Sequence, residues 1–247
     1  MKTRLLILGM AAICFCAAPA MAELTLQQVL DDITVNPLPP HTDTPAPGDT
    51  YKSSVIVGTD ELAMDEIWSI AGSGQMAATM IIEIAGWKDQ NAFGVYDATD
   101  SSKQVQIFSG PQSEGARAVM SILLDGSVEI SFVDSGVDFA GNAFGFYLST
   151  PNGKFFSDTG LNADAYDHLW AYQGKDIDWV QIANLQPGLW DDNEYVLAWE
   201  DTLGGGDNDH QDFVAMVESV MPVPAPAAIL LGVLGLGAAG VRLRKYV

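Results

Sequence analysis

The sequence predicts an all-β protein, an antiparallel β-sandwich or jelly-roll-like domain, and three observations favour this fold class. From residue 53 onward, short apolar segments alternate with clusters of Gly, Asp, Asn and Ser. Residues 127–133 alternate strictly, with Val128, Ile130 and Phe132 on one face and mainly polar side chains on the other, as a half-buried strand requires. No helical periodicity of useful length follows residue 70, and no repeat of fixed period is present.

The other elements follow in chain order. Residues 25–33 predict a short helix, and five prolines within residues 36–49 indicate an extended linker. Asp125-Gly126 lies between two apolar runs and is a strong hairpin signal. Further strands are expected at residues 79–85, 92–96, 105–108, 118–124, 143–148, 168–172, 194–199 and 213–217.

The N-terminus has the three-part layout of a secretion signal. A basic start and the apolar residues 5–15 precede Ala-Met-Ala at residues 20–22, which fits a cleavage site. We therefore expect residues 1–22 to be a signal peptide and the mature chain to begin at Glu23. Both cysteines of the protein lie within this segment. A disulfide, a thiolate metal site and a cysteine nucleophile are thus excluded from the mature chain.

The C-terminus predicts a membrane anchor of marginal length. Residues 227–241 are apolar or glycine throughout, and a basic Arg-Leu-Arg-Lys cluster follows. At about 1.5 Å per residue such a helix covers roughly 22 Å, short of a hydrocarbon core of about 30 Å. With Val-Pro-Ala-Pro at residues 223–226, this order resembles the PEP-CTERM sorting signal of exosortase substrates. The resemblance implies that residues 222–247 are recognised by an exosortase-type sorting protease in a Gram-negative cell.

The acidic charge is confined to the part between these ends. All 32 Asp and Glu lie between Glu23 and Glu218, where only six Lys or Arg occur, a formal charge of −26. Such a surface excludes nucleic acid as a partner and favours cations. We expect an exported protein of the cell surface or extracellular matrix that contacts the membrane only through its C-terminal anchor. Its domain would occupy residues 53–221, behind a helix and linker at residues 23–52.

One acidic loop carries the best candidate site. A glycine run flanked by carboxylates separates a strand expected to end at residue 199 from one expected to resume at residue 213. Carboxylates about 5 Å apart repel by roughly 3 kcal/mol at an effective dielectric of about 20. Gathering several of them favours a hard cation, and calcium prefers oxygen ligands. The predicted calcium ligands are Asp207, Asp209 and Asp212, with Glu200 and Asp201 as additional candidates.

The acidic loop has two other interpretations, an EF-hand and a solvated acidic turn. An EF-hand is excluded, because Asp212 stands where that motif needs a glycine and flanking helices are not predicted. A solvated acidic turn, in which Asn and Asp cap their own backbone, stays open as the alternative to a metal site. A second acidic cluster, Asp191, Asp192 and Glu194, is expected at the surface.

A second resemblance covers roughly residues 139–220. It rests on Ala-Phe-Gly-Phe-Tyr-Leu at residues 143–148, Phe-Phe-Ser-Asp at residues 155–158, and a closing run of Trp-Glu-Asp and Gly-Gly-Asp-x-Asp-x-x-Asp. These motifs resemble domain of unknown function 4114, which is common in exported bacterial proteins. His210 and Gln211 stand where that family usually has an aromatic residue and an Asn. The resemblance implies a fold and a cation site, and it implies no reaction.

The sequence does not favour an enzyme. It lacks a Gly-x-Ser-x-Gly elbow, a His-Glu-x-x-His motif and a glycine-rich phosphate loop. We expect His41, His168 and His210 to be ordinary strand or surface residues, and most of the six tryptophans to lie in the core. The first hypothesis is a non-enzymatic, calcium-stabilised module that contacts an exopolysaccharide or another surface protein. The alternative is a carbohydrate-active enzyme, with an acid pair facing a tryptophan-lined cleft, or a carbohydrate-binding protein.

Overall fold

The computed structural model describes residues 24–35, 50–83 and 89–223. Within these ranges the fold is all-β, with one helix, α1 (Leu26–Ile33), and two short 3-10 turns. The strands are β1 (Trp68–Ile70), β2 (Gln75–Glu83), β3 (Ala92–Asp97), β4 (Asp100–Ser109), β5 (Arg117–Ile122), β6 (Ser127–Ile130), β7 (Val133–Asp138), β8 (Ala143–Thr150), β9 (Gly153–Phe156), β10 (Leu169–Gln173), β11 (Trp179–Val180), β12 (Gly188–Leu189), β13 (Glu194–Trp199), β14 (Phe213–Glu218) and β15 (Val220–Pro222).

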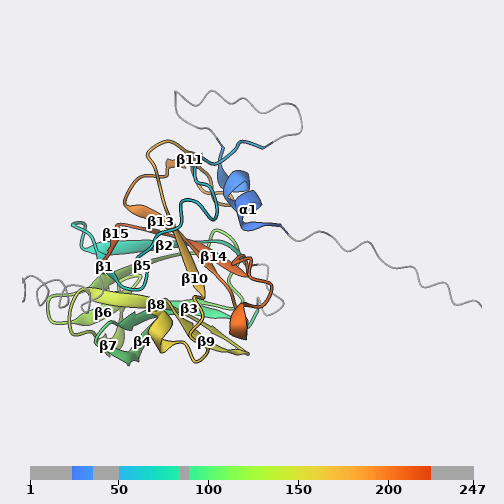
Figure 1. Ribbon diagram of the computed structural model, residues 1–247. Coiled ribbons are helices and arrows are strands. Elements are labelled where there is room, and N and C mark those ends of the chain that lie inside the picture. The colour runs from blue at the N-terminus through green and yellow to red at the C-terminus, as the bar shows by residue number, and fades with distance from the viewer. Residues whose placement is uncertain (1–23, 36–49, 84–88, 224–247) are drawn as a thin grey trace, which may run out of the picture.

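The strands form two large antiparallel sheets (Figure 1). The six-stranded sheet has the order β15-β1-β8-β3-β4, with β9 paired to β8. The seven-stranded sheet has the order β10-β13-β14-β2-β5-β6-β7, and β11 pairs with β12 as a separate ribbon. Strands distant in the sequence become neighbours, because β14 pairs with β2 and β15 pairs with β1. The last strands of the described chain therefore complete the sheets that the first strands begin.

The two sheets pack face to face through an aromatic core. The ring centroid of Phe93 in β3 lies 5.5 Å from that of Phe146 in β8 and 5.1 Å from that of Phe213 in β14. Trp68 of β1 lies 4.9 Å from Tyr195 of β13. Two of these contacts join one sheet to the other, and each buried aromatic side chain stabilises the fold by a few kcal/mol. This core holds together a sandwich whose described residues contain no cysteine.

The outer face of the seven-stranded sheet is covered as well. Helix α1 begins with a capping box formed by Thr25 and Gln28. Its Leu30 joins Trp190 and Val214 in a second buried cluster on this face. Figure 1 shows α1 and β11 on the side of the molecule away from β4 and β9. Strands β13 and β14 are thus buried on both faces, which explains their nearly continuous apolar sequences.

Most of the predicted elements are present, and both β5 and β6 end earlier than expected. The helix predicted at residues 25–33 and the hairpin at Asp125-Gly126 are confirmed. The strand predicted over residues 127–133 instead ends at Ile130, because Ser131 and Phe132 adopt φ of +50° and +67° and turn the chain into β7. The side chain of Phe132 is consequently exposed rather than buried.

Several other expectations were incomplete or concern residues outside the described ranges. The sequence did not predict the short or non-alternating strands β1, β7, β9, β11, β12 and β15. The expected signal peptide, the proline-rich linker and the C-terminal apolar segment lie outside the described residues. Within the described residues, no helix has the length and apolar character needed to cross a membrane.

Candidate metal site

The acidic loop joins two central strands of the seven-stranded sheet. Strand β13 ends at Trp199 and β14 begins at Phe213, as the sequence predicts. These two residues face each other in the antiparallel register. Their pairing closes residues 200–212 into a loop, which a 3-10 turn at Leu203–Gly205 folds back on itself. The acidic side chains of the loop are therefore held close to the end of a rigid strand pair.

Two glycines allow close approaches that other residues would block. Gly206 has φ of +43°, and a Cβ atom there would lie 2.4 Å from Glu200 Oε1. Gly205 has φ of +84°, and its Cβ would lie 2.3 Å from the ring of Tyr166. Side chains of L-residues disfavour this backbone region, whereas glycine adopts it freely. The glycine run thus brings the backbone against a carboxylate, an arrangement suited to a cation held by side-chain and backbone oxygens.

The five predicted ligands form two overlapping groups. Carboxylate oxygens of Glu200, Asp207 and Asp209 lie within 4.8 Å of one another, and so do those of Glu200, Asp201 and Asp212. In this loop the aspartates predicted as principal ligands, at positions 207, 209 and 212, do not form such a group without Glu200. The structure therefore places Glu200 at the centre of the site.

Hydrogen bonds partner three of the aspartates, Asp201, Asp209 and Asp212, but leave one oxygen of Glu200 without a partner. Asp201 accepts from Asn91 Nδ2 at 3.2 Å and from Thr202 Oγ1 at 3.1 Å. Asp212 accepts from the backbone N–H of Asp201 at 3.0 Å. Glu200 is 1% exposed, and its Oε2 has no hydrogen-bond partner. Because burying an unsatisfied polar atom costs free energy, this position suits a ligand that brings positive charge.

The crowding of negative charge changes the protonation of the site. Burial, together with the charge and hydrogen bond of Asp212, raises the pKa of Glu200 to about 8. Burial also raises the pKa of Asp212 to about 6. Without a cation, Glu200 therefore keeps its proton near neutral pH. A bound divalent cation would reverse this preference and favour the ionised carboxylate.

A buried histidine holds the start of the loop. His168 Nδ1 lies 2.9 Å from the carbonyl oxygen of Glu200, whose N–H donates to the carbonyl oxygen of His168 at 3.0 Å. His168 Nε2 lies 3.0 Å from Asp164 Oδ2, which also accepts from the N–H of Gly204 at 2.8 Å. Although burial opposes the change, these hydrogen bonds lower the pKa of Asp164 to about 2. The sequence did not reveal Asp164, His168 or Asn91 as supports, because they come from other segments.

A second buried histidine lies inside the loop. The ring of His210 stacks on Trp170 at a centroid distance of 3.7 Å, and its Nε2 lies 3.0 Å from the carbonyl oxygen of Asp167. Burial lowers the pKa of His210 to about 4, so the ring is uncharged at neutral pH. Both described histidines are fully buried parts of the scaffold, and His41 lies outside the described residues.

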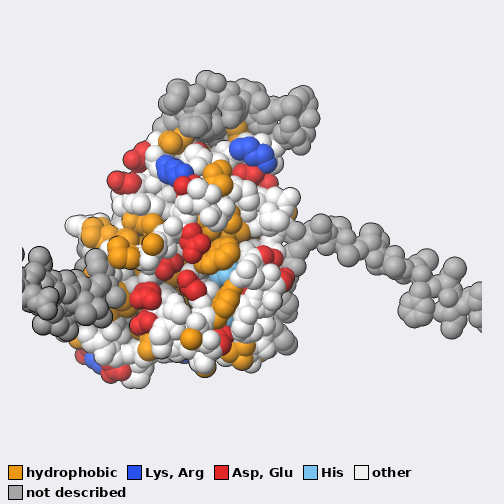
Figure 2. All heavy atoms as spheres, viewed as in Figure 1, with side chains coloured by type: hydrophobic (Ala, Val, Ile, Leu, Met, Phe, Trp, Pro, Cys, Tyr) orange, Lys and Arg blue, Asp and Glu red, His pale blue; other side chains and the backbone are white. Residues whose placement is uncertain are grey.

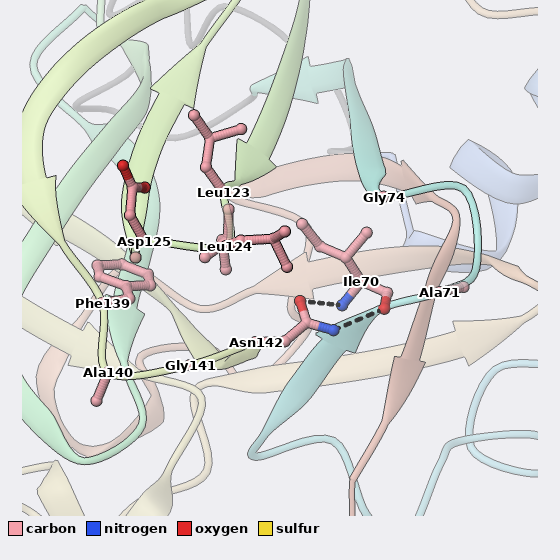
Figure 3. A pocket seen from close by; sticks show the side chains of 12 residues that line it. Ile70, Ala71, Gly74, Leu123, Leu124, Asp125, Phe139, Ala140, Gly141 and Asn142 are labelled. Carbon is pink, nitrogen blue, oxygen red and sulfur yellow. Dashed lines mark hydrogen bonds between the residues drawn. The ribbon is translucent and has the colours of Figure 1, made fainter.

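A hollow beside the β5–β6 turn contains no acid pair. A pocket of about 430 Å³ lies between the β5–β6 turn and the loop that precedes β8 (Figure 3). Figure 3 shows Leu124 directed toward Ile70. The side chain of Asn142 accepts a hydrogen bond from the backbone N–H of Ile70 and donates one to its carbonyl oxygen. Asp125 is the one acidic residue that lines this pocket, and no tryptophan lines it.

A smaller hollow does contain two acids. Glu194 and Glu218 face each other across the β13–β14 pair and line a pocket of about 290 Å³ that has no tryptophan in its wall. Burial, with the charge of Glu218, raises the pKa of Glu194 to about 8. Of the cluster expected at the surface, Asp192 is exposed whereas Glu194 is partly buried. No tryptophan lines this pocket. Trp68, Trp190 and Trp199 are buried in the core, whereas Trp170 and Trp179 are only partly buried.

The comparison with known proteins gives a family match, which lies in the C-terminal half of the chain. Residues 136–220 match the family model of a domain of unknown function (DUF4114). This match confirms the resemblance inferred over residues 139–220. No curated protein matches the chain. The matched region contributes β8 and β9 to one sheet and β10, β13 and β14 to the other, so its strands share both sheets with strands that precede it.

In the presence of a chelator, stability is expected to fall as the pH rises from about 4.5 to about 8. The pKa of Glu200 has its ordinary value of 4.5 in the unfolded chain and is raised to about 8 in the folded protein. Between these values the folded protein holds a proton that the unfolded chain has lost. Raising the pH therefore favours unfolding by up to about 1.4 kcal/mol per pH unit. Urea unfolding at several pH values measures this slope.

The variant Glu200→Gln should reduce the slope. Some slope remains, because burial also raises the pKa of Asp65 and of Glu194 to about 8. The matched control is Asp192→Asn, an exposed aspartate outside the loop, and it should leave the slope unchanged. A slope that is identical in Glu200→Gln and in the wild-type protein would show that Glu200 does not titrate in this way.

Proposed function

We propose that the protein is a non-enzymatic extracellular module whose fold is stabilised by calcium bound at Glu200. The observation that carries this proposal is the state of Glu200 itself. Its side chain is buried, its Oε2 has no partner, and two groups of carboxylates meet at it. A buried charge without compensation destabilises a fold. One divalent cation between the two groups would compensate them together.

Calcium suits this set of ligands better than zinc or magnesium. Calcium accepts six to eight oxygens in flexible geometry, whereas magnesium demands a near-ideal octahedron and zinc prefers His and Cys. The candidate ligands are carboxylates, and glycines with positive φ lie beside them. His210 is directed to the carbonyl oxygen of Asp167 through its Nε2. We expect an affinity on the order of 10⁻⁴ M, as in other extracellular calcium modules.

The two ends of the chain support an extracellular location. A secretion signal at residues 1–22 and a PEP-CTERM-like signal at residues 222–247 would direct the domain out of a Gram-negative cell. Its partners would be an exosortase-type protease and, at the destination, an exopolysaccharide or another surface protein. A domain without cysteines cannot use disulfides outside the cell, so a bound cation would take over part of their stabilising role.

A carbohydrate-active enzyme or a carbohydrate-binding protein is the second candidate, and the glutamate pair favours it. Glu194 and Glu218 share a pocket, and the high pKa of Glu194 suits a general acid. Release of reducing sugar from exopolysaccharide by the wild-type protein, and its loss in Glu194→Gln, would support the enzyme. Retention of the same polysaccharide without hydrolysis would support a binding module.

Calcium is expected to raise the melting temperature of the purified chain. At a free calcium concentration one hundred times the Kd, binding to the folded state adds about 2.7 kcal/mol. For a domain of this size the shift is roughly 5–10 °C. Scanning calorimetry in calcium and in chelator measures it. Glu200→Gln should remove most of the contribution of this site, and Asp207→Ala should reduce it.

The control for this experiment is again Asp192→Asn, which should keep the full shift because Asp192 is exposed and outside both carboxylate groups. Equal melting temperatures of the wild-type protein in calcium and in chelator would contradict calcium stabilisation. A shift that survives unchanged in both Glu200→Gln and Asp207→Ala would place the calcium elsewhere.

The sorting proposal predicts a change of location when the C-terminal signal is altered. Replacing Arg242, Arg244 and Lys245 by glutamine removes the basic stop that holds the segment in the membrane. Fractionation of producing cells followed by immunoblotting should show the variant leaving the membrane fraction without processing. Identical distribution and size of the two forms would argue against a signal at this end.

A further inference from the structure

Two buried amide side chains contact the carboxylate groups around Glu200. Asn91 Nδ2 donates to Asp201 Oδ2 at 3.2 Å, and Gln211 Nε2 donates to Asp209 Oδ2 at 2.5 Å. Asp201 belongs to one of the two groups and Asp209 to the other. Each group of three carboxylates therefore has one amide attached to it.

The oxygen atoms of these two amides are buried without a hydrogen-bond partner in the described chain. Asn91 and Gln211 are each 2% exposed. An amide oxygen can accept two hydrogen bonds, and burying it unsatisfied costs free energy. Together with Glu200 Oε2, the two amides bring three unsatisfied buried oxygens to the same set of contacting residues.

Turning either amide end for end would not satisfy its oxygen. The oxygen would then face the carboxylate of Asp201 or Asp209, and two acceptors would meet with no hydrogen between them. The aspartates therefore fix the nitrogen ends of the amides. A cation is a partner that an amide oxygen and a carboxylate oxygen can share.

Asn91 reaches the acidic loop from the other sheet. It directly precedes Ala92 of β3, which pairs with Ser149 of β8, and Thr150 directly follows Ser149. Thr150 Oγ1 donates to the carbonyl oxygen of Asp201 at 3.3 Å. Two residues at this end of the six-stranded sheet thus hold Asp201, although the loop belongs to the seven-stranded sheet.

A neutral ligand suits the charge of this protein. Figure 2 shows acidic side chains in the middle of one face, with the visible Lys and Arg side chains away from them. Lys52, Arg117 and Lys175 form ion pairs with carboxylates outside the acidic loop. Amide oxygens add ligands to a cation site without adding to the negative charge that already surrounds it.

We propose that the side-chain oxygens of Asn91 and Gln211 are ligands of the calcium ion at Glu200. The inference rests on the proposed function and deepens it, because it adds two neutral ligands to the carboxylates. Calcium takes amide carbonyl oxygens as well as carboxylates, and it needs six to eight oxygens. Rotation about the last side-chain bond turns each oxygen toward the ion. Through Asn91 the ion links the two sheets of the sandwich.

The competing explanation is that both amides serve only as donors to the aspartates, with water on their oxygens. Thr202 has such a donor role, since its Oγ1 donates to Asp201 Oδ1 at 3.1 Å. The two explanations differ when a carboxylate of the same shape replaces the amide. The carboxylate keeps an oxygen that can bind calcium and cannot donate to the neighbouring aspartate.

The Kd for calcium, measured by isothermal titration of the purified, chelator-stripped chain, tests the proposal. Gln211→Met and Asn91→Leu lose the oxygen and should each raise the Kd about tenfold or more, at least as much as the loss of an outer-shell partner. Gln211→Glu and Asn91→Asp keep an oxygen in place. Their Kd should stay within about threefold of the wild-type value or fall below it, because ligand charge strengthens calcium binding.

The control for added charge compares Thr202→Asp with Thr202→Val. Both variants remove the hydroxyl that donates to Asp201, and Thr202→Asp adds a negative charge beside the same aspartate. The carboxylate should recover affinity at positions 91 and 211 and not at position 202. Equal recovery at position 202 would overturn the proposal. A Kd as high in the carboxylate variant as in the apolar variant would overturn the assignment of that residue.

Crystals of the wild-type chain grown with calcium decide the question if the variants do not fold, as judged by circular dichroism. An ion about 2.3–2.6 Å from Asn91 Oδ1 and Gln211 Oε1 is the expected result. An ion in contact with Glu200 but with neither amide oxygen would overturn this inference and leave the proposed function intact. A wild-type chain that binds no calcium would overturn both.

Discussion

The carboxyl group of Glu200 is buried at the point where β13 leaves its sheet, and the negative charge that it carries when ionised needs a compensating partner. The β13–β14 pair is rigid, because both strands are covered on both faces and pair at Trp199 and Phe213, where the loop closes. The glycines let the returning backbone reach the carboxylate, and His168 fixes the backbone of Glu200 from behind. In our proposal a divalent cation compensates Glu200 and its neighbouring aspartates together.

The acidic composition of the chain affects the stability of the fold. A chain with 32 acidic and 11 basic residues repels itself, and such repulsion destabilises a compact state. Much of the negative charge is solvated on the surface. Buried acidic side chains occur at several places in the described chain, and two of them, Glu200 and Asp201, lie in the acidic loop. The region that matches DUF4114 carries all five carboxylates around Glu200.

Local patterns were sufficient to predict much of the fold. Alternation and turn residues identified the long strands, and the run from Trp199 to Phe213 identified the loop that joins two of them. Short strands such as β1 and β15 escaped prediction, because their partners are far away in the sequence and three residues show no periodicity. The turn at Ser131 and Phe132 escaped as well, since an apolar residue at positive φ breaks the usual rule for turns.

The sequence also named the five carboxylates but could not rank them. Composition favoured Asp207, Asp209 and Asp212, whereas burial selects Glu200, and burial depends on tertiary packing that no local pattern shows. Crystals grown with calcium well above the expected Kd test the central claim most directly. We expect anomalous density for an ion about 2.3–2.6 Å from a carboxylate oxygen of Glu200. A protonated Glu200 with no ion in contact, in crystals that hold calcium elsewhere, would contradict it.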